Sequence, residues 1–186
     1  SFSEKFKKAG GEEFELISRI EKKFVKVSNL SCHHYQDNFL VRVKKLFFRS
    51  LNYKIGLIST IEYQIGDLVY KSTHTTPNAI ILNDLLFQMV ESGCEYCFME
   101  VSSHGLAQNR VLGLNFDIAV FTNISRDHLD YHESFSEYID IKKSFFDNLS
   151  SDAKSIINMD DPYSSQMTLD TISNKIFYSV KNNSNY

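Results

Sequence analysis

The chain has 186 residues, of which 42% are hydrophobic and 23% charged, and its formal net charge is −3. This length fits one domain with at most a short appendage, and the near-neutral charge argues against a cationic surface for nucleic acid or anionic lipid. The odd number of cysteines, three, argues against a disulfide framework, and we find no bilayer-spanning run or signal peptide, so we predict a cytoplasmic enzyme domain.

Three helical patterns and one strand are predicted in the first half of the chain. Residues 1–26 are charge-rich and carry apolar residues at helical spacing: Phe14, Ile17, Ile20 and Phe24. Residues 41–51 have a second helical pattern, and the apolar run 54–59 follows as a strand. Residues 78–92 form a third helix, which Gly93 is expected to end, with one apolar face: Ile81, Leu85, Leu86 and Met89.

The second half alternates strands and helices. Apolar runs at 96–101, 116–122, 153–158 and 175–178 suit buried strands, and residues 136–149 have the period of an amphipathic helix. This alternation predicts an α/β fold in three layers, a mostly parallel sheet with helices on both faces. Ligands bind such sheets at the carboxyl ends of the strands, and here the polar motifs directly follow the apolar runs.

The first polar motif runs from Glu100 to His104 and contains two serines between them. A carboxylate at the end of a buried strand is a hard oxygen ligand of the kind that Mg²⁺ prefers. The alternative is a strand end whose polar residues face solvent or cap the next element. These residues alone do not decide between the two.

The second motif, residues 122–132, contains Asn123 and places six ionisable side chains in the seven positions from Arg126 to His132. His128 and His132 stand four apart, a spacing that could chelate zinc on a helix. However, no glutamate stands beside the first histidine, so the zinc-protease interpretation is poor. A solvated loop is the other alternative.

The third motif, residues 73–77, places the hydroxyls of Thr75 and Thr76 ahead of a predicted helix. Hydroxyls and N–H groups at such a place can bind an anion, but Thr76 before Pro77 is also a good N-cap.

A lone pair of cysteines, Cys94 and Cys97, cannot form a four-thiolate zinc site. We interpret both cysteines as core residues.

Together these segments resemble the Mur ligase family, because three separate motifs occur in the order and spacing of that family. The resemblance covers roughly residues 51–162 and is strongest to the branch that adds the third residue of the peptidoglycan stem peptide. It implies the three-layer central domain of this family, related to P-loop NTPases. We expect this domain over residues 31–186, incomplete at its C-terminal side, and an N-terminal remnant or helix over residues 1–30.

The resemblance implies roles for single residues. Positions that hold the substrate UDP-MurNAc-L-Ala-D-Glu correspond to Thr75, Thr76, Ser102, Gln108 and Arg110. Asn123 corresponds to a position near the nucleotide, and the magnesium ligands correspond to Glu100, His128 and Lys142, the last carried as a carbamate. The implied cofactors are ATP and Mg²⁺: phosphate passes to the D-glutamate carboxylate, and the amine of diaminopimelate or lysine attacks the acyl phosphate.

The chain departs from the family at the phosphate loop. The family sequence GTNGKTT should fall near residues 33–39, which read HHYQDNF and offer neither glycine nor lysine. Read one base later, the codons for residues 32–39 permit Val-Thr-Thr-Thr-Lys-Thr-Thr, so a frameshift is one hypothesis for this difference. The domain that selects the incoming amino acid has no counterpart here, so the sequence does not decide between diaminopimelate and lysine.

We therefore predict that the chain by itself is not a competent ligase. Two alternatives stay open at this point. One is a non-catalytic module that binds a nucleotide sugar, and the other is a ligase of the folylpolyglutamate-synthetase kind, which shares the scaffold. The segment SSHGLAQNR favours the muramoyl substrate over folate.

Overall fold

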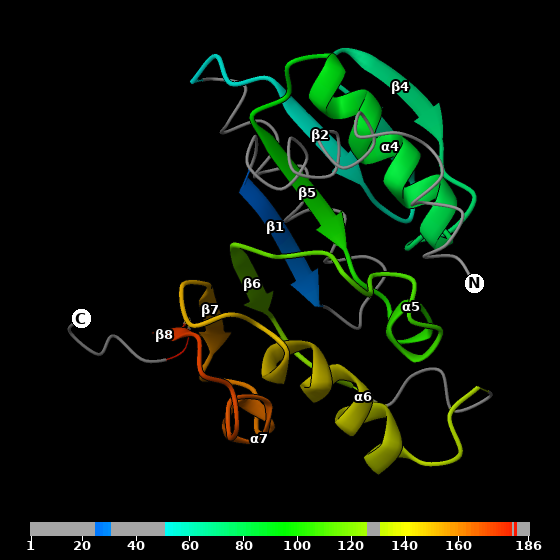
Figure 1. The fold of residues 1–186 in the computed structure, drawn as a ribbon. Helices are drawn as coiled ribbons and strands as arrows, with labels where there is room; N and C mark the ends of the chain where they lie inside the picture. Colours follow the sequence, from blue (N-terminus) through cyan, green and yellow to red (C-terminus); the bar gives the residue numbers. More distant parts are fainter. Residues whose placement is uncertain (1–24, 31–50, 126–130, 180, 182–186) are drawn as a thin grey trace, which may run out of the picture.

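The computed structural model describes residues 25–30, 51–125, 131–179 and 181 (Figure 1). Eight strands form one sheet: β1 Val25–Leu30, β2 Ile55–Ile58, β3 Glu62–Ile65, β4 Leu68–Lys71, β5 Tyr96–Glu100, β6 Ile118–Phe121, β7 Lys154–Asn158 and β8 Asn174–Tyr178. Their spatial order is β4-β3-β2-β5-β1-β6-β7-β8. Six neighbouring strands pair in parallel, and β3 and β4 add an antiparallel hairpin at one edge.

Both faces of this sheet bury apolar side chains. Alternate residues of the strands point to opposite faces, so the short apolar runs supply two separate clusters. One cluster contains Ile55, Leu57, Phe98 and Val120, and the other contains Ile58, Met99, Phe121 and Ile157. A mostly parallel sheet that is covered on both faces confirms the predicted α/β fold class.

Four helices are described: α4 Ala79–Glu91, α5 Ser103–Ala107, α6 Phe135–Asp147 and α7 Ser164–Met167. α4 and α6 contribute to the same apolar cluster, through Leu86 and Met89 from α4 and Tyr138 and Phe146 from α6, so both cover one face of the sheet. In Figure 1 they lie along the sheet beside β2 and β6. None of the helices in the described ranges is long and apolar enough to cross a membrane.

α4 confirms the predicted helix 78–92 but corrects two details. Its N-cap is Asn78, whose side chain accepts hydrogen bonds from Ile80 N and Ile81 N, so the N-cap role considered for Thr76 is wrong. Ile81 is 41% exposed, and Leu82 takes its place on the buried face of the helix. The other three predicted residues of that face are buried as expected. Gly93 follows with φ +76°, a conformation that favours glycine and ends the helix as predicted.

The sequence patterns missed β1 and the β3–β4 hairpin. β1 begins at Val25, so the predicted helix 1–26 is wrong for its last two residues, and the rest of that helix lies outside the described residues, as does most of the predicted helix 41–51. In the hairpin, Ile65 pairs with Leu68 across two residues, and Gly66 has φ +59°. A glycine followed by aspartate between two short apolar runs is a known hairpin signal.

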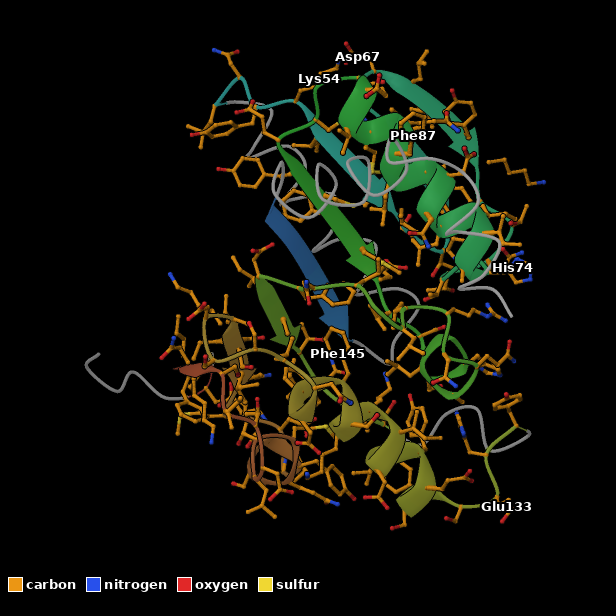
Figure 2. All side chains as sticks on the ribbon, in the orientation of Figure 1. Lys54, Asp67, His74, Phe87, Glu133 and Phe145 are labelled. Carbon is orange, nitrogen blue, oxygen red and sulfur yellow. The ribbon has the colours of Figure 1, made fainter. Side chains whose placement is uncertain are left out.

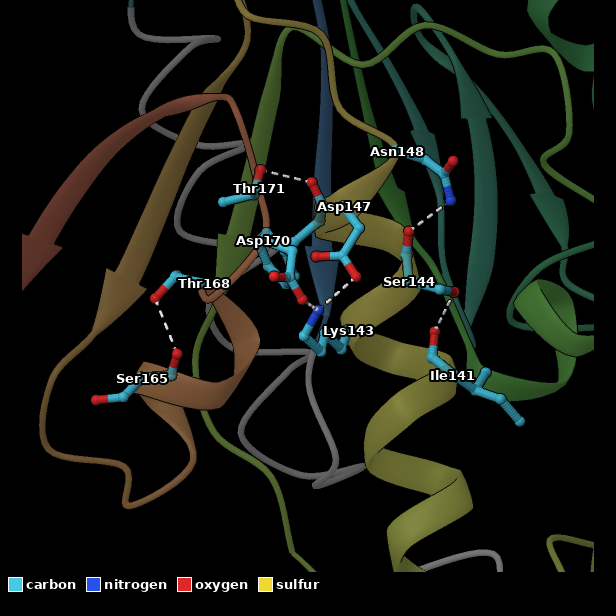
Figure 3. Close-up of polar contacts among 10 residues, drawn as sticks. Ile141, Lys143, Ser144, Asp147, Asn148, Ser165, Thr168, Asp170 and Thr171 are labelled. Carbon is cyan, nitrogen blue, oxygen red and sulfur yellow. Dashed lines mark hydrogen bonds and ion pairs between the residues drawn. The ribbon is translucent and has the colours of Figure 1, made fainter.

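The C-terminal half of α6 is held to the segment before β8 by polar contacts (Figure 3). Lys143 lies between two carboxylates, with Nζ 2.6 Å from Asp147 Oδ2 and also paired with Asp170. The hydroxyl of Thr171 donates to Phe146 O over 2.6 Å. The hydrogen bonds that Lys143 donates to Asp147 and Asp170 raise its pKa above the usual value of 10.5.

Replacing Lys143 tests this attachment. Lys143→Ala should lower the free energy of unfolding at pH 7 by up to about 1 kcal/mol, the range for ion pairs near the surface. The raised pKa means that the contribution is complete below pH 10.5 and is lost as the pH rises through the pKa of the folded protein. Urea unfolding of both proteins at pH 7 and above pH 10.5 measures this. A difference that stays the same at high pH would assign the effect to lost aliphatic packing.

Candidate functional site

The polar motifs meet at the carboxyl end of the parallel strands, as predicted. Thr60 follows β2, Glu100 is the last residue of β5, and Thr122 follows β6. β1 pairs with both β5 and β6 and therefore ends between Glu100 and Thr122. Figure 2 shows His74 at this end of the molecule, with Lys54 and Asp67 at the opposite end.

The Glu100 carboxylate is buried, with 5% of the residue exposed. Its Oε2 accepts hydrogen bonds from Thr60 N (2.8 Å) and Thr60 Oγ1 (2.7 Å), and Thr60 Oγ1 lies 3.0 Å from Thr75 Oγ1. The other oxygen, Oε1, is buried and meets no hydrogen-bond donor within the described part of the chain. The solvent-facing alternative is therefore wrong. A buried carboxylate with one oriented oxygen and one unpaired oxygen has the chemistry of a cation ligand.

Thr76 joins the third motif to the first. Its hydroxyl donates to Glu100 O over 2.9 Å and accepts from Ser102 N over 2.9 Å, and the residue is fully buried. Gly105 packs against the same side chain: a Cβ at position 105 would stand 2.7 Å from Thr76 Cγ2, closer than a real contact allows. The close approach therefore needs a glycine at this position of α5.

α5 begins and ends with side chains of the predicted substrate set. Ser102 is its N-cap and accepts from Gly105 N over 3.0 Å. At the other end Asn109 has φ +54°, and Arg110 N donates to Gly105 O over 2.8 Å. Asn109 N also donates to Leu106 O, which completes a Schellman motif with a left-handed residue. This turn reverses the chain so that residues 108 and 110 lie side by side.

The guanidinium group of Arg110 is fixed by three hydrogen bonds. Nε and Nη2 donate to Gln108 Oε1 over 3.1 and 2.6 Å, and Nη1 donates to Thr76 O over 2.6 Å. Together with the contact between Thr60 and Thr75, these bonds bring all five predicted substrate positions to one place. Their role in binding stays a prediction.

His132, one of the two histidines of the considered zinc pair, is held inside the protein. It is buried, and its Nε2 lies 2.9 Å from Ser103 Oγ, while its ring lies 5.2 Å from the ring of Tyr138. The partner of the considered zinc pair, His128, lies outside the described residues. Within those residues no group of three His, Cys, Asp or Glu side chains could hold a metal ion.

Lys142 points into the protein from α6. Only 2% of the residue is exposed, and Nζ lies 5.2 Å from the centroid of the Tyr138 ring. Lys142 is therefore not a solvated surface lysine like its neighbour Lys143, which forms surface ion pairs. Burying an ammonium group costs free energy, and a buried lysine is therefore a candidate for a functional residue. The predicted metal set of Glu100, His128 and Lys142 is untested as a set, because His128 is not described.

Asn123 lies in a segment that the last residue of β7 and a residue shortly after it hold in place. Asn158 Nδ2 donates to Thr122 O over 2.7 Å, and the buried Asp161 accepts from Ile124 N over 2.9 Å. The side-chain oxygen of Asn123 is buried and meets no donor among the described residues. The sequence patterns did not indicate Asn158, Asp161 or Thr60 as site residues, although the adjacent carboxylates of Asp160 and Asp161 stand shortly after a strand and are a signal in the sequence.

Cys94, just before β5, and Cys97, within β5, are core residues as predicted. Both are buried, and burial raises the pKa of the Cys94 thiol. A raised thiol pKa disfavours the thiolate that metals bind. Neither cysteine belongs to the site.

Comparison with known proteins places these features in a family. Residues 42–186 match the family described as Mur ligase middle domain. Two relatives are similar to this chain, and both are named UDP-N-acetylmuramoyl-L-alanyl-D-glutamate--2,6-diaminopimelate ligase. The protein from Cytophaga hutchinsonii is 52% identical over 133 residues, 72% of this chain, and that from Bacteroides thetaiotaomicron is 48% identical over 139 residues, 75% of this chain. The chain spans only 27% and 29% of the length of these relatives.

Solved structures share the fold. One titled as a UDP-N-acetylmuramoyl-L-alanyl-D-glutamate--2,6-diaminopimelate ligase has a TM-score of 0.77 and 24% identity, and the match covers 92% of this chain and 35% of that one. E. coli FolC in complex with DHPP and ADP has a TM-score of 0.58 and 15% identity, with 87% and 45% covered. At these identities the likeness concerns the fold alone.

The left-handed turn after α5 can be tested by stability. Asn109→Ala should lower the free energy of unfolding by about 1 kcal/mol, because a Cβ without a polar side chain is disfavoured at φ +54°. Asn109→Gly is the matched control and should leave stability nearly unchanged. Urea unfolding at pH 7 measures both variants. Equal stability of the alanine and glycine variants would contradict the turn described here.

Proposed function

The chain belongs to the Mur ligase middle-domain family, and from this premise we propose that it is part of an ATP-dependent ligase of peptidoglycan precursor synthesis. The proposed reaction adds diaminopimelate to UDP-MurNAc-L-Ala-D-Glu. The names of the relatives favour diaminopimelate over lysine, a choice that the sequence left open. The observation that carries the proposal is the hydrogen-bonded group of Thr76, Ser102, Gln108 and Arg110 beside the buried carboxylate of Glu100.

The residues fit the proposed chemistry in two parts. Arg110 offers a guanidinium plane of fixed orientation, and such a plane binds carboxylates like those of the dipeptide. Glu100, His128 and carbamylated Lys142 would hold Mg²⁺, and the unpaired oxygen of Glu100 supports this assignment. Bound Mg²⁺ would neutralise charge on the transferred phosphoryl group of ATP. In this proposal Thr60 orients the carboxylate through its N–H and its hydroxyl.

The proposed domain begins earlier than residue 31. β1 is a central strand of the sheet, between β5 and β6, so we propose that the domain starts at or before Val25. The residues that replace the family's phosphate loop, 33–39, follow β1 and lie outside the described residues. Their lack of glycine and lysine supports the prediction that this chain alone does not transfer phosphate. ATP and UDP-linked substrates support a place in the cytoplasm.

A second candidate function follows from the difference between the predicted substrate residues and the phosphate-loop sequence. The residues that we propose hold the substrate, Thr75, Thr76, Ser102, Gln108 and Arg110 (the substrate-holding group), all lie in the described part of the chain, whereas the phosphate-loop sequence is not of the family kind. The chain by itself would then be a module that binds the nucleotide sugar without ATP. The folylpolyglutamate-synthetase alternative is supported only by a shared fold, at 14% identity to a structure titled as a folylpolyglutamate synthase.

Titration calorimetry of the chain separates these functions. We expect UDP-MurNAc-L-Ala-D-Glu to bind, folate not to bind, and Mg-ATP to bind weakly or not at all. Arg110→Met keeps the length of the side chain but removes the guanidinium group, and should weaken binding of the muramoyl dipeptide by at least about tenfold. Binding of folate in place of the muramoyl dipeptide would overturn the proposal, and tight binding of Mg-ATP would contradict the prediction for residues 33–39.

Lys142 can be tested in a complete ligase, with a GTNGKTT loop at residues 33–39 and the remaining domains of a relative. Lys142→Ala should lower turnover by about a hundredfold or more, because one charge-stabilising group at the reacting phosphate is lost. Added short carboxylates such as formate should partly restore it, because they supply the missing oxygen ligand.

Lys143→Ala is the control for Lys142, since Lys143 pairs with Asp147 and Asp170 on another side of α6 (Figure 3). It should leave turnover nearly unchanged. Full activity of Lys142→Ala, or an equal loss in both variants, would show that the carbamate assignment is wrong.

A further inference from the structure

An exposed aromatic side chain stands beside the substrate-holding group. Tyr131 is 44% exposed, but its ring is in contact with two others: the ring centroid of His104 lies 4.0 Å away and that of His132 lies 5.0 Å away. Gln108 Nε2 also lies 3.1 Å from the Tyr131 hydroxyl. A surface tyrosine usually changes rotamer freely, whereas this one has neighbours on its ring and at its hydroxyl.

The hydrogen bonds connect Tyr131 to Arg110 through one amide. Arginine can only donate, so the atom of Gln108 that faces Arg110 must be the carbonyl oxygen. The amide nitrogen of Gln108 therefore faces Tyr131 and donates to its hydroxyl oxygen. The O–H proton of Tyr131 must then point away from Gln108, where it can donate to another group.

The chemistry of this surface differs from that of its neighbours. Arg110 and the hydroxyl groups around Thr76 suit carboxylates, because they present charge and donors. Tyr131 presents an uncharged flat ring with one hydroxyl at its edge. A ring of this kind suits a ligand part with C–H groups on one face and hydroxyl or amide groups at its rim, such as an N-acetylated pyranose.

We propose that the ring of Tyr131 forms one wall of the substrate site and packs against the sugar ring of the muramoyl dipeptide. This proposal rests on the function proposed above. His104 supports the Tyr131 ring from one side, and Gln108, which also fixes Arg110, donates to the Tyr131 hydroxyl. Tyr131 and Arg110 thereby hold the sugar and the peptide parts of one ligand in a fixed relation.

Calorimetric titration of the chain with UDP-MurNAc-L-Ala-D-Glu tests the ring. Tyr131→Ala should raise the dissociation constant about three- to tenfold, the range for one aromatic contact. Tyr131→Leu keeps bulk without a flat ring and should behave like alanine, whereas Tyr131→Phe should stay within about twofold of the wild type. Tyr70→Ala is the matched control, because Tyr70 is 43% exposed but lies on β4, at the far edge of the sheet, and it should change nothing.

A second titration with the nucleotide-free ligand, MurNAc-L-Ala-D-Glu, identifies the part of the substrate that the ring contacts. The same fold-change with both ligands is expected for a contact with the sugar. A loss seen only with the UDP-linked ligand would overturn the sugar assignment, and an unchanged dissociation constant in Tyr131→Ala and Tyr131→Leu would overturn the proposal. If the wild-type chain binds neither ligand, the proposed function fails first and this inference fails with it.

Discussion

The candidate site depends on one buried hydroxyl, that of Thr76. It donates to the carbonyl at the end of β5 and accepts from the first N–H group of the following turn, while the carbonyl of the same residue accepts from Arg110. Residues 100–102 and Arg110, which lie 24 to 34 residues further along the sequence, thus all bond to this one residue. A valine of similar shape would leave two buried backbone groups without partners, which costs free energy for each. This geometry also explains the close packing of Gly105 against Thr76.

Around this point the protein buries two ionisable groups of the predicted site. Glu100 and Lys142 are both buried, one at the end of a central strand and one on the inner side of α6. Apolar residues at these positions would make a more stable core, because a buried charge loses its hydration. Groups of this kind are typical of functional sites, where stability is given up for chemistry. The neighbouring rings of Tyr138 and His132 fill the space between Lys142 and α5.

The chain shares its fold with FolC at only 15% identity, and such a shared sheet does not determine which substrate is bound. The same order of strands and helices can place different side chains at the carboxyl ends of its strands. In this chain the predicted substrate and nucleotide residues lie in three short segments after β4, β5 and β6, and the turn at Asn109 brings Gln108 and Arg110 together. The sheet determines where these segments stand, and their side chains determine the chemistry that they offer.

The sequence by itself determined the local features of this protein. Apolar periodicity located α4, α6 and the buried strands within a few residues, and the polar motifs indicated Glu100 after a strand and Thr76 ahead of a helix. Lys142 was indicated only by the family resemblance. Periodicity describes which residues share a face within one element, but it does not include the partner element. For this reason the N-cap of α4, the exposure of Ile81 and the central place of β1 were misjudged or missed. Only the tertiary structure decided that Thr76 bonds to Glu100 and Ser102, and that Gln108 donates to the Tyr131 hydroxyl. Contacts between distant segments depend on the order and register of the strands, which no single segment contains.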